Sequence, residues 1–187
     1  KKYLDAKKYF ARLNKVSYQH LFFEGFLSNI LISWAEASQN NRVDSLKFLN
    51  NIPERYYNLK KVQNAFLQCY FDTPKTQNAF EQLLNDEKSS FSRYYFFLTN
   101  YLLSKDKNIE AKKIIKLSRK KHNSNLLLKE TENFILSKKG KKIKNIFNCK
   151  NPKDVIAEIF YIIANMHSSE NQYQLSNFYL KISHFLN

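Results

Sequence analysis

Glycine and proline are scarce in this chain, which has 2 Gly and 3 Pro among 187 residues. Hairpin turns and β-bulges depend on such residues, so their scarcity favours an all-helical architecture. The two glycines, Gly25 and Gly140, stand alone. Isolated glycines cannot form the G-x-x-x-x-G-K or G-x-G-x-x-G loops that cradle phosphates, and no G-x-S-x-G nucleophile turn occurs.

Residue patterns typical of catalysis or metal binding are also missing. The four histidines, His20, His122, His167 and His184, are spread along the chain, and no H-E-x-x-H sequence occurs. We therefore expect no metal, no cofactor and no enzymatic activity, although triads assembled from distant positions leave no local motif.

Cysteines and long apolar runs are few. Cys69 and Cys149 lie far apart in the sequence, and we expect two ordinary thiols rather than a disulfide, which leaves the redox compartment open. The sequence from Lys1 does not resemble a signal peptide and has no apolar run of about 18 residues, so we expect a soluble segment, either cytoplasmic or periplasmic. The chain has no initial Met and ends at Asn187 just after an expected helix, which favours a fragment of a longer array.

Apolar residues make up 43% of the chain and recur with helical spacing, which argues against disorder. The clearest case is residues 93–125. One apolar stripe there contains Tyr95, Leu98 and Leu102, and a second contains Ala111, Ile115 and Ser118. Because a polar turn, S-K-D-K-N, separates the stripes, we expect two helices folded against each other. Further helices are expected at 2–13, 18–38, 43–52, 58–71, 76–86 and 123–137, and one begins at Pro152.

The central pair resembles a tetratricopeptide repeat, a helix pair of about 34 residues. Small residues let the two backbones approach, and large ones fill the space around them. The family positions are filled by Tyr95, Leu98, Thr99, Leu102, Ala111, Ile115 and Ser118, then again by Phe160, Ile163, Ala164, Tyr173, Ser176, Leu180 and Ser183. The small residues of the second helices follow at intervals close to one repeat, except that the last interval is close to two; they are Ala6, Ser45, Ala79, Ala111 and Ser176.

This resemblance implies an all-α, right-handed superhelix of antiparallel helix pairs, like the divergent arrays of bacterial proteins. One domain would cover 1–187, with repeats at 1–16 (second helix only), 18–53, 58–87, 90–122, 123–148 (degenerate) and 151–187. Helix caps are expected at Ser17, at Thr73 with Pro74 as the first helical residue, and at Asn151 before Pro152.

The resemblance also places a partner groove on the first helices of the pairs. The implied groove residues are Trp34, Lys61, Asn64, Gln68, Arg93, Phe96, Asn100, Tyr161 and Asn165. Amides could bond a peptide backbone, while aromatic rings and cations offer contact area and charge. Packing between neighbouring repeats is the alternative role. Asn100 and Asn165 match the asparagine of the family's carboxylate clamp, but no lysine stands four residues before either.

Positive charge is concentrated in one segment. The net charge is +15, and residues 105–153 contribute +12 of it. The basic patch comprises Lys112, Lys113, Lys116, Arg119, Lys120, Lys138, Lys139, Lys141, Lys142 and Lys144. Such a patch could hold phosphates or an acidic partner. A solvated face in a lysine-rich composition is the competing interpretation, because Lys, Asn, Ile, Phe and Tyr together indicate an AT-rich coding sequence.

The consecutive aromatics Tyr94, Tyr95, Phe96 and Phe97 allow either core packing or base stacking, and their spread around a helix favours the core. From the sequence we expect a noncatalytic scaffold that binds a peptide or protein partner in its groove. The alternative is a binder of nucleic acid or another acidic polymer through residues 105–144.

Overall fold

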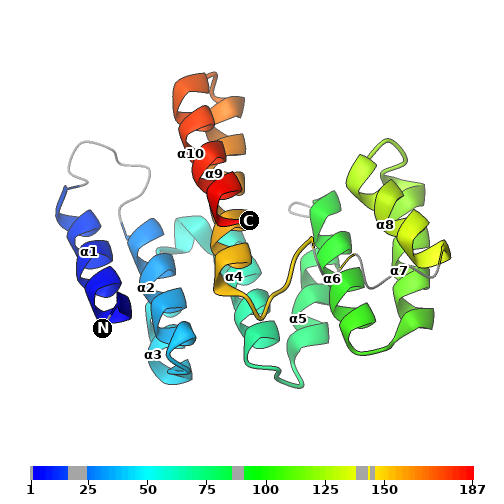
Figure 1. Cartoon of the computed structure of the whole chain (residues 1–187), viewed down its shortest axis with the longest axis horizontal. Coiled ribbons are helices and arrows are strands. Elements are labelled where there is room, and N and C mark those ends of the chain that lie inside the picture. The colour runs from blue at the N-terminus through cyan, green and yellow to red at the C-terminus, as the bar shows by residue number, and fades with distance from the viewer. Residues whose placement is uncertain (1, 17–24, 86–90, 138–142, 144–145) are drawn as a thin grey trace. The chain divides into compact units, whose positions relative to one another are not determined.

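The computed structural model describes residues 2–16, 25–85, 91–137, 143 and 146–187, and within these ranges the protein is all-helical (Figure 1). The helices are α1 (Lys2–Val16), α2 (Leu27–Ser38), α3 (Arg42–Asn50), the 3-10 helix η2 (Glu54–Tyr56), α4 (Tyr57–Tyr70), α5 (Thr76–Asn85), α6 (Ser92–Ser104), α7 (Asn108–Lys121), α8 (Leu126–Leu136), α9 (Pro152–Ser169) and α10 (Tyr173–Leu186). The all-α prediction is confirmed.

The chain folds into two compact units. Unit 1 contains Lys1–Gln63 and Cys149–Asn187, and unit 2 contains Asn64–Asn148. Within unit 1, α2 packs against α1, α3 and α9, and α9 packs along α10. Within unit 2, α6 packs against α5, α7 and α8, and α7 also contacts α8. The pairs α2–α3, α6–α7 and α9–α10 are each joined by a short connection, so their helices run antiparallel (Figure 1).

The same turn closes four helices. In each, one Asn or Asp has a positive φ: Asn40 (60°), Asp72 (53°), Asp106 (57°) and Asn171 (60°). The amide after each of these residues donates to the carbonyl five residues earlier, as from Asn41 to Glu36 at 3.0 Å and from Lys107 to Leu102 at 2.9 Å. This is the Schellman arrangement, which satisfies carbonyls left open at a helix C-terminus. The first three turn residues follow one another at close to one repeat length, and the fourth follows at close to two.

Small buried residues recur at fixed distances from these turns. Seven residues before each turn residue stand Ser33, Ala65, Thr99 and Ala164. On the second helix of the pair, a small buried residue stands five positions after three of the turn residues. These are Ser45 after Asn40, Ala111 after Asp106 and Ser176 after Asn171. Ser33 and Ser45 meet directly, because the Ser33 hydroxyl donates to the Ser45 carbonyl at 2.8 Å. The small residues therefore mark where paired backbones approach most closely.

Aromatic side chains fill the core of unit 2. Phe66 lies 4.9 Å from Phe97 and 5.3 Å from Phe147 between ring centroids, and Phe97 lies 4.6 Å from Phe147. In unit 1 the core is built around Trp34, which is fully buried and donates its indole N–H to Gln63 at 2.8 Å.

Most expected helices are present, and most of their ends lie within one or two residues of the predicted ones. The exceptions are α1, which ends at Val16 and not at residue 13, α8, which begins at Leu126 and not at residue 123, and α2, which begins only at Leu27 although a helix was expected over 18–38. Asn151 caps α9, accepting from the Lys153 amide at 3.2 Å, with Pro152 in the first turn, as expected. The capping role of Ser17, the helix expected over 18–24 and the lysine-rich stretch around Gly140 lie outside the described residues.

Two expectations around α5 are wrong. Pro74 is not the first helical residue, because α5 begins at Thr76, and the Thr73 hydroxyl donates to the Gln68 side chain at 2.6 Å instead of capping a helix. The buried small residue of this helix is Thr76, which is fully buried, and not Ala79, which is half-buried.

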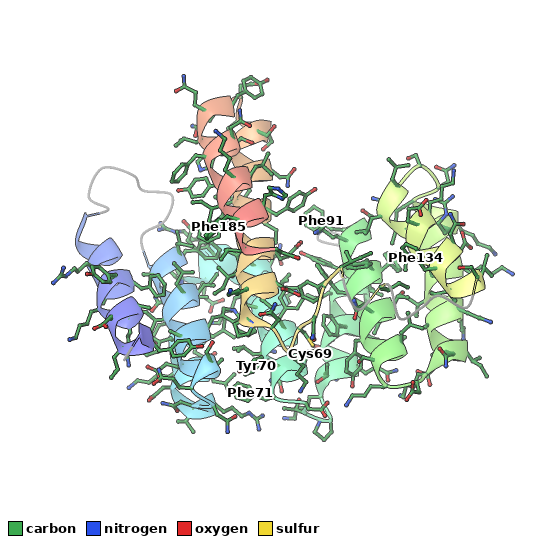
Figure 2. All side chains as sticks on the ribbon, in the orientation of Figure 1. Cys69, Tyr70, Phe71, Phe91, Phe134 and Phe185 are labelled. Carbon is green, nitrogen blue, oxygen red and sulfur yellow. The ribbon has the colours of Figure 1, made fainter. Side chains whose placement is uncertain are left out.

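The expectation of two free thiols is also wrong, since Cys69 and Cys149 are both disulfide-bonded. This prediction failed because spacing along a chain does not decide whether a cysteine forms a disulfide. Figure 2 labels Cys69 on α4, where its side chain is buried.

Candidate functional site

The groove residues of unit 1 differ in accessibility. Trp34 belongs to the core, as described above. Lys61 is half-buried, with its ammonium 4.6 Å from the centroid of the Tyr57 ring. On α9, Tyr161 is half-buried and Asn165 is exposed, and the Asn165 amide donates to the Tyr161 carbonyl at 2.7 Å.

In unit 2 the groove residues of α6 are mostly internal. Phe96 is fully buried, and the buried Asn100 amide donates to the carbonyls of Phe147 at 2.8 Å and Ile143 at 3.2 Å. Arg93 is half-buried, with its guanidinium 5.8 Å from the centroid of the Phe97 ring.

The two groove residues that unit 2 takes from α4 bond to each other. Gln68 donates to Asn64 at 3.2 Å while accepting from Thr73. Gln68 is buried and Asn64 is half-buried, so Asn64 is the more accessible of the pair.

The aromatic cluster on α6 is part of the core. Tyr94, Tyr95, Phe96 and Phe97 are all buried, as the core interpretation predicted. Their ring faces are taken up by neighbouring residues, as where Phe96 meets Phe97 at 5.5 Å, edge to face. A base-stacking platform needs accessible rings, which these four residues do not supply.

The part of the basic patch on α7 forms an exposed surface. Lys112, Lys113, Lys116 and Lys120 are exposed, while Ala111, Ile115 and Ser118 face the interior. Arg119 is set apart from these lysines, because it is half-buried and pairs with Glu132 at 3.3 Å. The remaining members of the patch, Lys138, Lys139, Lys141, Lys142 and Lys144, lie outside the described residues.

The helix α10 carries an exposed apolar surface that was not expected from the sequence. Phe178 is 55% exposed and Phe185 is 88% exposed, and Tyr173, Leu175 and Leu180 are also exposed. Phe185 is labelled on α10 in Figure 2. We call Phe178 and Phe185, with Leu175, the α10 apolar face. The sequence did contain a signal for this surface. Leu175, Phe178 and Phe185 are apolar but do not occupy the positions that the repeat pattern assigns to the interior, such as Ser176 and Ser183.

The opposite side of α10 packs on α9. Tyr179 stacks on His167 with ring centroids 5.4 Å apart and on Phe160 at 6.0 Å. Burial raises the pKa of the Tyr179 phenol above its ordinary value of 10.0. The Ser183 hydroxyl donates to the Ala157 carbonyl at 2.8 Å. These contacts fix the orientation of α10, so the exposure of Phe178 and Phe185 follows from how the helix is docked.

Equivalent positions of α7 and α10 have opposite chemistry. Counted from the turn residues Asp106 and Asn171, Lys113 corresponds to Phe178 and Lys120 to Phe185. The repeat geometry thus leaves these positions outward-facing in both helices without dictating which residue type fills them.

Within the described ranges, no group of three or more His, Cys, Asp or Glu residues could hold a metal ion, and no helix is long and apolar enough to cross a membrane. The His167 ring forms a hydrogen bond with the Gln172 side chain, with 2.7 Å between Nδ1 and Oε1. The His122 ring packs near Tyr95, with 5.7 Å between the ring centroids. No protein-family model, curated protein or solved structure matches the chain.

Proposed function

We propose that this protein is a noncatalytic scaffold of the tetratricopeptide-repeat type that binds a protein partner. The α10 apolar face carries the proposal, because its two phenylalanines are more than half exposed on a helix that is firmly packed on its other side. Contiguous exposed apolar surface marks protein interaction sites in soluble proteins, whereas single exposed apolar residues do not. Nucleic-acid phosphates would gain little from such a surface.

The repeat pattern supports the family part of the proposal. The left-handed turns recur at close to one and two repeat lengths, and each has a buried small residue seven positions earlier. A recurrence at close to 34 residues is typical of arrays of helix pairs. A right-handed superhelix with a concave groove is the family's architecture. In such a groove the accessible candidates are Lys61, Asn64, Arg93, Tyr161 and Asn165.

A binder of nucleic acid or another acidic polymer through 105–144 is the alternative function. It is supported by the exposed lysines of α7, and it makes a different prediction about salt and nuclease. Electrostatic binding to phosphates weakens steeply as salt rises, and apolar contacts do not.

The test is a pull-down with the immobilised chain at low and moderate salt, with and without nuclease, followed by identification of the retained proteins. The variant Phe178→Glu/Phe185→Glu places two carboxylates on the α10 apolar face. Val43→Glu is the matched control, because Val43 is 78% exposed on α3, away from that face.

We expect a discrete protein to be retained by the parent chain and by Val43→Glu in the presence of nuclease at moderate salt. The double glutamate variant should retain at least about tenfold less of it, the effect of losing a little over one kcal/mol of binding free energy. Equal retention by the double variant would reject the α10 apolar face, and retention of nucleic acid alone would favour the alternative function.

A further inference from the structure

The helix α7 presents several lysines with no acidic partner in the part of the chain that the structure describes. Besides Lys121 at its end, Lys112, Lys113, Lys116 and Lys120 are exposed, and none of these four forms an ion pair within the described ranges. The nearby carboxylates are engaged elsewhere: Glu110 meets Lys107 at 3.7 Å, and Glu132 meets Arg119. With Ile109 and Leu117, these lysines form what we call the α7 lysine face.

This charge arrangement works against the helix that carries it. Lys112, Lys116 and Lys120 follow one another at i, i+4 spacing, where like charges destabilise a helix. The helix dipole favours cations only in the last turn, which accounts for Lys120 but not for Lys112 or Lys113 near the beginning of α7. An anionic partner would remove this repulsion.

The face is held in a fixed orientation. On the inner side of α7, Ala111 and Ser118 are fully buried and Ile115 nearly so. At the beginning of the helix, Gln77 of α5 bonds both Lys107 at 2.7 Å and Glu110 at 3.3 Å. At the end, the Arg119 contact with Glu132 ties α7 to α8. The outward lysines therefore project from a helix anchored at both ends.

The apolar residues on the same face indicate which kind of anion fits. Ile109 is 86% exposed and Leu117 is 46% exposed, and both lie among the lysines. Protein interfaces combine apolar contacts with surrounding polar groups, whereas phosphates offer no apolar contact. The helix α7 has no aromatic residue for base stacking, and its exposed cations are lysines, which lack the planar fork that arginine uses for bidentate recognition.

We propose that the α7 lysine face binds an acidic segment of a partner protein that also carries apolar side chains. Its carboxylates would meet Lys112, Lys113, Lys116 and Lys120, and its apolar side chains would cover Ile109 and Leu117. The proposal rests on the protein-binding function above and adds a second surface with its own partner chemistry.

The experiment measures binding of three labelled probes to the full chain by fluorescence anisotropy at about 0.1 M salt, where surface charges still interact across about 10 Å. The probes are a synthetic peptide with glutamates at i, i+4 spacing and leucines between them, the same peptide with glutamines in place of leucines, and a single-stranded oligothymidylate of equal charge.

The lysine-face variant is Lys113→Gln/Lys116→Gln/Lys120→Gln. Its matched control, Lys8→Gln/Lys47→Gln/Lys181→Gln, removes as many charges from exposed positions of other helices. A further variant, Ile109→Ser, leaves the charge unchanged. Circular dichroism and thermal unfolding establish that each variant is folded before binding is compared.

We expect the leucine-containing peptide to bind most tightly, and the lysine-face variant to bind it about tenfold more weakly, while the control changes by less than about twofold. Ile109→Ser should weaken the leucine peptide and leave the glutamine peptide unaffected. Tighter binding of the oligothymidylate, or equal losses in the lysine-face and control variants, would overturn the proposal. Neither result would affect the proposal that a partner binds the α10 apolar face, because the pull-down tests that proposal with substitutions at Phe178 and Phe185.

Discussion

Two buried polar side chains, Glu36 and Asn100, are hydrogen-bonded within their own units. The carboxylate of Glu36 is buried, accepts from Asn41 at 2.9 Å and pairs with Lys7. The Asn100 amide bonds two backbone carbonyls. Because an unpaired buried polar group costs more than a hydrogen bond gains, these contacts are structural requirements. Asn100 therefore has a role in stability whatever the protein binds.

Replacing Asn100 by leucine should lower the free energy of unfolding by about 2–3 kcal/mol, because the carbonyls of Ile143 and Phe147 would lose their donor. Asn165→Leu is the matched control. Asn165 also stands six residues before its turn residue, but it is exposed, so the change should cost no more than about 0.5 kcal/mol. Urea denaturation measures the free energy of unfolding of both variants. Equal losses of stability would show that the hydrogen bonds of Asn100 contribute no more to stability than the surface contact of Asn165.

At the scale of elements, the repeating unit is a helix pair with a left-handed Asn or Asp in the turn. Glycine adopts positive φ most easily, yet the chain uses asparagine or aspartate at all four of these turns. Asparagine and aspartate tolerate this conformation better than other residues with a side chain. This explains how a sequence with 2 Gly can still form compact helix pairs.

The turn at Asn40 offers a test of this backbone requirement. Asn40→Ala should destabilise the protein by about 1 kcal/mol, because a Cβ without a compensating polar group is disfavoured at positive φ. Asn40→Gly should be neutral or stabilising, since glycine enters this region without steric cost. Thermal unfolding of both variants checks the order. An alanine variant at least as stable as the glycine variant would contradict the assigned turn conformation.

Helices and pairing were predictable at this scale because apolar and small residues recur at helical spacing, as at Thr99, Ala111 and Ile115. The role of Pro74 was not predictable, because proline fits equally well in a turn and in a first helical turn. The left-handed residues were also missed. Polar turns such as Q-N-N-R contain several asparagines, and sequence alone does not say which one adopts positive φ.

At the scale of the whole molecule, the sequence predicted the fold class better than the binding surfaces. The family pattern assigns groove positions by their offset in the repeat, but burial depends on long-range neighbours. Trp34 is internal, with its indole N–H donating to Gln63 of α4, and Phe96 is internal because α6 packs against α5, α7 and α8. The prediction of a single continuous array over 1–187 stays a prediction.

The two proposed binding surfaces belong to different units. The α7 lysine face belongs to unit 2 and the α10 apolar face to unit 1. A scaffold can vary such outward positions independently, because helix-pair stability depends mainly on the inward ones. The protein-binding proposal therefore depends on whether a partner engages the α10 apolar face.

Hydrogen exchange measures that engagement most directly, comparing the chain alone with the chain bound to the protein retained in the pull-down. A partner seated on Phe178 and Phe185 should slow exchange of amides in α10 (Tyr173–Leu186), while those of α3 (Arg42–Asn50), which carries the control residue Val43, exchange as before. Unchanged exchange in α10, with slowing confined to other helices, would contradict the assignment of the α10 apolar face as the binding surface.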